Sequence, residues 1–88
     1  MFLELKRLVD ACGGPTRVAA SVTVRGKAFI SRQNIESWLA RGFPAAYNAA
    51  SVEVRELCIV ARREGLDIGH GELIEASKAY RLELKNGL

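Results

Sequence analysis

The chain has 88 residues, of which 49% are hydrophobic and 26% are charged, and its formal net charge is +3. This length suits one domain with one modest core, and the composition is typical of an ordinary globular protein. Charged residues interrupt the apolar start of the chain, so residues 1–7 predict neither a signal peptide nor a membrane-spanning helix. We therefore expect a cytoplasmic protein in which residues 1–88 form a single domain.

The positive charge is concentrated in the first part of the chain. Residues 1–50 contain seven Lys or Arg against three Asp or Glu, whereas residues 51–88 contain six against seven. Within residues 15–41 the only acidic residue is Glu36. A basic face on a small domain is the electrostatic footprint of a polyanion-binding protein, although solvated basic faces are also common.

The first two predicted helices are separated by a very short break. Apolar residues at helical spacing predict a helix over residues 3–12, which ends at Gly13. Pro15 then begins a second helix over residues 15–21, because the missing N–H of a proline costs nothing at a first helical position. The two-residue break requires a sharp corner between these helices.

Residues 22–30 predict either a small β-hairpin or an extended loop. β-branched residues precede the tip at Gly26 and apolar residues follow it. Arg25 and Lys27 make the tip basic. A finger that touches a DNA backbone and a solvated loop are equally compatible with this pattern.

Residues 31–41 predict a third helix with polar residues near its start. Ser31 is a good N-cap residue, because its hydroxyl can accept a hydrogen bond from a free backbone N–H. Gly42 suits a left-handed residue just past the helix end, and Phe43 can then fold back onto Trp38. Three residues are expected to anchor the helix inward: Ile35, Trp38 and Leu39.

The polar side chains of this third helix suit the edges of DNA bases. Arg32, Gln33 and Asn34 are residue types that pair bidentately with guanine or adenine in a major groove. In isolation, the solvated first turn of any helix is the favoured interpretation of these three residues, and only a helix-turn-helix context reverses it. Glu36 either accepts a hydrogen bond from a cytosine amine or pairs with Arg32 one turn away, and we favour the ion pair.

The C-terminal half predicts two further helices. Ser51 is expected to cap a fourth helix that ends at Gly65, and Ile59 lies on the face opposite the apolar stripe of this helix. That stripe consists of Val54, Leu57, Cys58 and Ala61. Residues 72–82 predict a fifth helix, but residues 80–85 also fit the alternation of a strand that pairs with its twin in a dimer.

Catalytic and metal-binding patterns are sparse. Cys12 and Cys58 lie on apolar stripes and are interpreted as small buried hydrophobic residues. Together with His70, expected in a surface loop, they are too few and too scattered for a metal site. We find no nucleophile with a local base and no carboxylate cluster. We therefore expect no enzyme activity, no metal or other cofactor, no small-molecule substrate and no membrane partner.

Residues 30–38 resemble the recognition-helix pattern of Cro-like bacteriophage regulators. In that pattern an aliphatic residue and a serine precede three polar residues, an aliphatic residue, two further positions and a tryptophan. Three other segments resemble prophage-type members of this family in the same order: residues 13–19, 41–47 and 61–68. The resemblance covers about residues 5–75. One departure is clear: the family joins these helices by a turn of three or four residues, whereas here the stretch from Val22 to Ile30 carries about six extra residues.

The resemblance implies a mainly α fold with a small four- to five-helix, Cro- or lambda-repressor-like helix-turn-helix domain. Its helix-turn-helix core would cover about residues 3–41, and helices within residues 51–85 would serve packing or dimerisation. The implied function is sequence-specific binding of double-stranded DNA by a phage or prophage transcriptional regulator, with repression favoured, acting as a homodimer on a two-fold operator. The alternative is a protein-interaction module or antitoxin-like component that uses the same fold to bind a protein partner.

Site residues follow from matching positions in this family. The base-reading candidates are Arg32, Gln33, Asn34 and Ser37. The resemblance assigns phosphate contacts to Thr16, Arg17 and Ser31. We add three further phosphate-binding candidates because of their positive charge and their positions in the chain: Arg25, Lys27 and Arg41. Thr16 and Arg17 lie where the free N–H groups of a helix start favour a phosphate.

Overall fold

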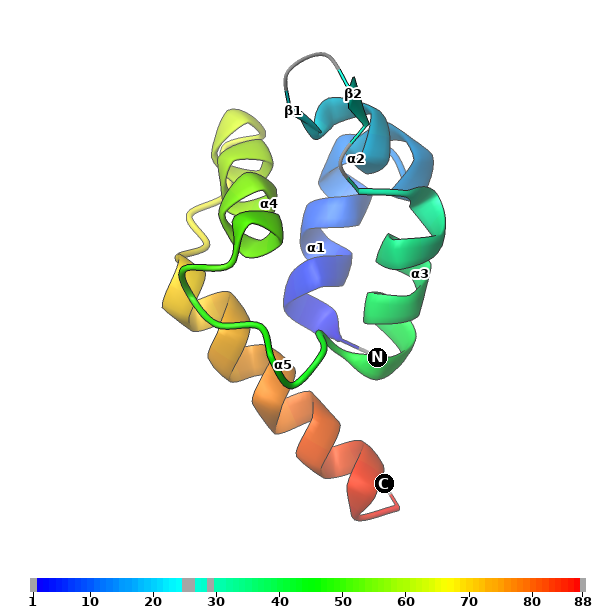
Figure 1. Cartoon of the computed structure of the whole chain (residues 1–88), viewed down its shortest axis with the longest axis vertical. Helices are drawn as coiled ribbons and strands as arrows, with labels where there is room; N and C mark the ends of the chain where they lie inside the picture. Colours follow the sequence, from blue (N-terminus) through cyan, green and yellow to red (C-terminus); the bar gives the residue numbers. More distant parts are fainter. Residues whose placement is uncertain (1, 25–26, 29, 88) are drawn as a thin grey trace.

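The computed structural model describes residues 2–24, 27–28 and 30–87, and the chain is mainly α-helical (Figure 1). The helices are α1 (Leu3–Cys12), α2 (Pro15–Ser21), α3 (Arg32–Arg41), α4 (Val52–Arg63) and α5 (His70–Lys85). Two short strands, β1 (Thr23–Val24) and β2 (Lys27–Ala28), pair antiparallel between α2 and α3. Thr23 lies opposite Ala28, and Val24 lies opposite Lys27. The hairpin alternative for this segment is therefore the one that forms.

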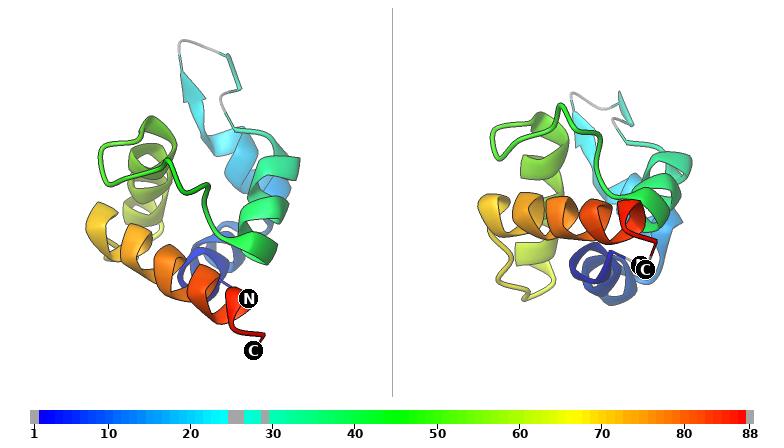
Figure 2. Two further views of the ribbon diagram at one scale, coloured as in Figure 1. Left: turned by 60° about the horizontal axis from the view of Figure 1, so that its bottom comes forward. Right: turned by 90° about the horizontal axis from the view of Figure 1, so that it is seen from below.

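The helices pack around α1, which lies between α3 and α4 (Figures 1 and 2). α1 contacts α2, α3 and α5, while α2 also packs against α3. α5 runs beneath this group and contacts α1, α3 and α4. The end of α3 therefore lies next to α5, although a long stretch of sequence separates them.

The core is one cluster to which every helix contributes. Its largest fully buried side chains are Phe2, Leu5, Leu8, Val18, Val22, Ile30, Ile35, Phe43, Val54, Leu57 and Leu73. The predicted apolar stripe of α4 is buried in full, and Ile59 on the opposite face is 41% exposed. Helical periodicity therefore predicted the buried face of α4 correctly.

α3 begins and ends at the predicted residues, but with a ψ of 177° Gly42 is not in the left-handed helical conformation that was expected. Ser31 is the N-cap residue, and Gly42 follows the last turn with a φ of 80°. The rings of Trp38 and Phe43 meet edge to face with their centroids 5.2 Å apart. Ile35 and Trp38 are buried, and Leu39 is half-buried. The inward face of α3 is therefore confirmed.

α5 differs from the sequence expectation at both ends. His70 is the first residue of the helix rather than a loop residue, and the helix continues past the predicted end at residue 82 to Lys85, so the strand alternative for residues 80–85 does not form. Helical geometry stacks the ring of Tyr80 on that of Phe2, with the ring centroids 6.2 Å apart. This contact stabilises the helix where the local sequence pattern was ambiguous. Among the described residues, no helix combines the length and the apolarity needed to cross a membrane.

The start of α4 also differs in detail. Ser51 occupies the N-cap position, but its hydroxyl makes no hydrogen bond to the first turn of α4. Instead the Ser51 Oγ accepts a bond of 2.9 Å from the backbone N–H of Asn48. The serine stabilises the preceding loop, in which Asn48 also accepts a bond from the N–H of Ala50.

Candidate nucleic-acid interface

The outer face of α3 carries a row of exposed polar residues. Gln33, Ser37 and Arg41 follow one another at four-residue intervals, so they lie above one another on the helix surface. All three are exposed, whereas Ile35 and Trp38 on the opposite face are buried. The helix therefore presents one polar edge to any partner that approaches from outside.

Arg32 is held beside this row by an ion pair. Its Nη1 lies 3.7 Å from Oε1 of Glu36, and both side chains are about half exposed. This contact confirms the predicted pairing of these two residues along the helix. Exposed pairs of this kind are worth little energy, so Arg32 can turn towards another anion at small cost.

Asn34 and Ser31 are joined in a reciprocal cap. The backbone N–H and the hydroxyl of Ser31 donate to Oδ1 of Asn34 at 3.0 and 2.8 Å. The backbone N–H of Asn34 in turn donates to Oγ of Ser31 at 3.1 Å. A bidentate contact to adenine needs both the oxygen and the amide group of an asparagine, and this oxygen is engaged. The two residues therefore hold the start of α3, and Gln33 is better placed than Asn34 to read a base.

Further phosphate-binding candidates lie at the start of α2 and in β2. Thr16 and Arg17 are exposed in the first turn of α2. Arg17 folds back towards Gly13, since its Cδ lies 3.0 Å from the position that a Cβ at Gly13 would take. Lys27 belongs to β2, and Arg25 lies outside the described residues.

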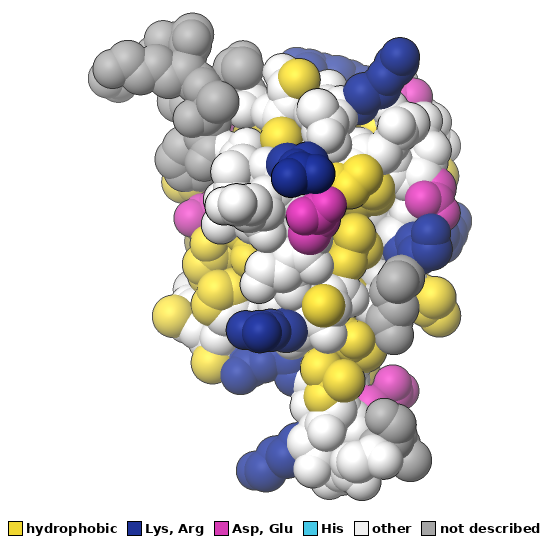
Figure 3. All heavy atoms as spheres, turned by 90° about the vertical axis from the view of Figure 1, so that its right-hand side faces the viewer, with side chains coloured by type: hydrophobic (Ala, Val, Ile, Leu, Met, Phe, Trp, Pro, Cys, Tyr) yellow, Lys and Arg dark blue, Asp and Glu magenta, His cyan; other side chains and the backbone are white. Residues whose placement is uncertain are grey.

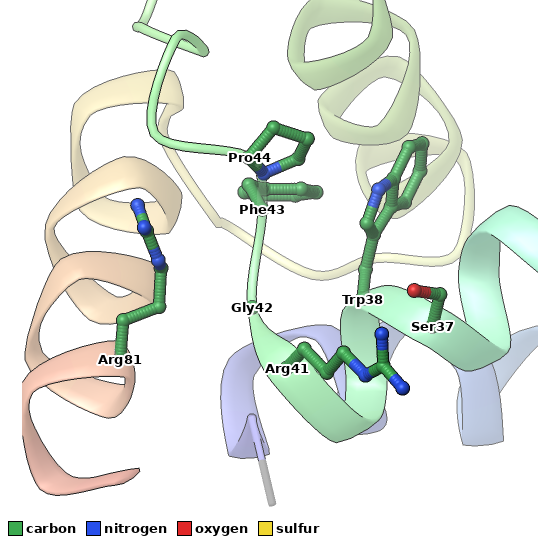
Figure 4. A pocket seen from close by; sticks show the side chains of 7 residues that line it. All are labelled: Ser37, Trp38, Arg41, Gly42, Phe43, Pro44 and Arg81. Carbon is green, nitrogen blue, oxygen red and sulfur yellow. The ribbon is translucent and has the colours of Figure 1, made fainter. Parts of the chain in front are cut away.

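An open pocket lies where α3 ends (Figure 4). Its volume is about 370 Å³, and its lining residues are Ser37, Trp38, Arg41, Gly42, Phe43, Pro44 and Arg81. Two of the candidate residues, Ser37 and Arg41, come together here. Arg81 from α5 joins them, and the sequence analysis missed it because no local pattern links it to α3.

Close packing between α3 and α5 explains why Arg81 reaches this pocket. A Cβ at Gly42 would lie 2.8 Å from Cγ of Arg81 and 3.1 Å from Oγ of Ser77. The hydroxyl of Tyr80 donates a bond of 2.8 Å to the backbone carbonyl of Ala40. Glycine at position 42 is therefore what allows α5 to approach the end of α3.

Basic side chains are spread over the face that carries α3 rather than gathered in one cluster (Figure 3). Hydrophobic and acidic side chains lie between them. Neither Arg41 nor Arg81 forms an ion pair with any residue that the structure describes. Their charges are therefore available to an external anion without the loss of an ion pair.

The two cysteines, Cys12 at the end of α1 and Cys58 in α4, are free thiols. Burial raises the pKa of Cys58, with a smaller raising effect from Glu72 and a lowering effect from Arg62. Burial and then the charge of Glu64 raise the pKa of the half-buried Cys12. Both thiols therefore stay protonated at neutral pH. Within the described ranges, no three His, Cys, Asp or Glu residues gather where they could hold a metal ion.

No family model, curated protein or solved structure matches this chain. Its function is therefore inferred from the residues and the geometry of the face around α3.

Proposed function

We propose that the chain binds double-stranded DNA in a sequence-specific manner and acts as a phage- or prophage-type transcriptional repressor. The observation that carries this proposal is the division of α3 into a buried apolar face and an exposed row of Gln33, Ser37 and Arg41. Glutamine pairs bidentately with adenine and serine bonds to either kind of edge, so Gln33 and Ser37 are the base readers of this row, and Arg32 beside it can pair with guanine. In this proposal α3 lies in the major groove.

The neighbouring helices support a helix-turn-helix arrangement for this docking. We take α2 and α3 as its two helices, with α2 packed against both α1 and α3. Ala19 of α2 is half-buried against the core, where a small side chain permits close helix packing. The hairpin of β1 and β2 would then take the place of the short turn that joins the two helices in Cro-like regulators.

Backbone contacts would fix the register of α3 on the duplex. Thr16 and Arg17 at the start of α2 and Arg41 at the end of α3 are all exposed. We add Lys27 of β2 to these candidates because it is basic and belongs to the segment between α2 and α3. Such phosphate contacts orient a protein on DNA without reading its sequence.

A homodimer would match a two-fold operator. The part of α5 that extends beyond the body of the molecule carries two exposed leucines, Leu82 and Leu84, at 59% and 43% exposure (Figure 1). Ile59 on α4 is a further exposed apolar residue. We expect weak self-association through these faces, which sedimentation of the free protein and of the DNA complex measures. A strict monomer at high concentration and on DNA would contradict it.

The decisive experiment selects bound sequences from a random pool of duplex DNA. A sequence-specific binder enriches one motif, and a homodimer enriches that motif as an inverted repeat. The affinity for the selected site should also fall steeply as salt rises, because bound phosphates release counterions.

Paired variants then connect this binding to α3. The double variant Arg32→Ala/Gln33→Ala should lose at least about tenfold in affinity for the selected site. Arg62→Ala, an exposed substitution on α4, serves as the control and should bind almost as wild type. Absence of any enriched sequence, or equal binding by the double variant, would contradict the proposal and favour the protein-binding alternative.

A further inference from the structure

The pocket at the end of α3 has a cationic side chain on each side. Arg41 comes from α3 and Arg81 from α5, and the backbone of Gly42 passes between them (Figure 4). The Arg41 guanidinium lies on the Ser37 side of the Gly42 backbone, whereas the Arg81 guanidinium lies on the opposite side. The pocket is open, so a ligand can enter it from solvent.

The chemistry of the lining selects an anion. No carboxylate is among the lining residues, and neither arginine is paired within the described part of the chain. Guanidinium groups bind phosphate through two parallel N–H···O bonds, a geometry that Lys cannot reproduce. The Ser37 hydroxyl adds a neutral donor on the same side as Arg41. A phosphate group is therefore the ligand that these side chains suit best.

The two helices that carry the arginines are fixed relative to each other. Phe43 donates its backbone N–H to the buried Ser77 hydroxyl at 2.8 Å, and Tyr80 donates to the carbonyl of Ala40 at 2.8 Å. Gly42 itself is buried against α5. Binding an anion here would require ordering of two side chains but no movement of the backbone, which keeps the entropy cost low.

The pocket is continuous with the polar row of α3. Ser37 and Arg41 belong both to that row and to the lining of the pocket. A duplex that places its bases along the row would therefore bring its sugar–phosphate backbone to the end of α3, where the pocket opens.

We propose that this pocket takes a backbone phosphate of the DNA that α3 reads, bound by the guanidinium groups of Arg41 and Arg81. α5 then belongs to the DNA-binding surface and is more than a packing element. This inference rests on the proposed function and adds a phosphodiester site to it.

The test compares two variants that each remove one positive charge. Arg81→Gln keeps the part of the side chain that packs on Gly42 and removes the guanidinium group. Arg63→Gln makes the same change at an exposed position of α4, outside the pocket. Affinities are measured for the selected duplex and for an unrelated duplex over a range of salt concentrations, after thermal unfolding has shown that both variants fold.

Arg81→Gln should weaken binding to both duplexes by a similar factor, roughly three- to tenfold, and lower the salt slope by about one. Arg81→Lys keeps the charge and should retain the slope while losing part of the affinity. Equal behaviour of Arg81→Gln and Arg63→Gln, with wild-type binding intact, would overturn this inference and leave the proposed function standing. A wild-type protein that binds neither duplex would overturn both.

Discussion

The hydroxyl of Ser77, in the middle of α5, accepts a hydrogen bond of 2.8 Å from the backbone N–H of Phe43, just past the end of α3. Ser77 is only 2% exposed, and it is the buried polar residue of the described core. A buried N–H that loses its partner is costly, so this one bond ties the C-terminal helix to the exit of α3.

The Ser77→Ala variant should therefore be less stable by about 1–3 kcal/mol, because the N–H of Phe43 would stay buried without an acceptor. Chemical denaturation followed by circular dichroism measures this loss. Ser21→Ala is the matched control, since its hydroxyl bonds to the carbonyl of Arg17 at an exposed site and should change stability by under about 0.5 kcal/mol. Equal effects of the two substitutions would contradict the role assigned to Ser77.

Gly42→Ala should destabilise the protein by about 2–3 kcal/mol, because φ of 80° with ψ of 177° is a conformation that glycine alone adopts without strain. The new Cβ would also meet Cγ of Arg81 at 2.8 Å. Gly71→Ala provides the control within α5, where an added Cβ meets no heavy atom within 4 Å. Gly71→Ala should raise the free energy of unfolding by about 0.4–1 kcal/mol, since the substitution restricts only the unfolded chain. Thermal unfolding of both variants should thus show shifts of opposite sign.

Asn34→Ala and Gln33→Ala should separate helix capping from base reading. Loss of the reciprocal cap with Ser31 should lower stability by about 0.5–1 kcal/mol in Asn34→Ala. Gln33→Ala should leave stability within about 0.5 kcal/mol of wild type. In DNA binding, Gln33→Ala should lose about 1–3 kcal/mol of discrimination between bases at one position of the site. Denaturation and competition binding give both quantities, and the reverse pattern would show that Asn34 is the reader.

Tyr47 should titrate at high pH. Burial, then its hydrogen bond of 3.0 Å to Oε2 of Glu53 and the charge of that carboxylate, raise the pKa of Tyr47 above its ordinary value near 10. The native state therefore favours the neutral phenol. Its contribution to stability is complete below the unfolded pKa near 10 and is lost as pH rises through the raised pKa.

A Tyr80→Phe background leaves Tyr47 as the only tyrosine, so absorbance titration reports it directly. Its ionisation should begin later in the folded protein than after unfolding in denaturant. Adding Glu53→Gln should bring the folded pKa back towards 10, because the negative charge is gone. Identical folded and unfolded titrations would contradict the burial and bonding of this phenol.

Local sequence determined the helices up to residue 41 and the inward face of α3. Pro15 at a helix start, Ser31 at an N-cap and Gly42 after the last turn are signals that act within a few residues. The contact between Trp38 and Phe43 is equally local. The capping bond from Asn34 was not predicted, because the usual capping box has Glu or Gln three positions after the N-cap serine.

Tertiary structure alone decided where α5 ends and which residues meet at the pocket. Residues 80–85 fit two periodicities, and packing of Tyr80 on Phe2 and Ala40 selected the helix. Arg81 joins Arg41 because glycine at position 42 leaves room for α5. These contacts join residues far apart in the chain, so they depend on how the helices pack, which short-range propensity and spacing do not encode.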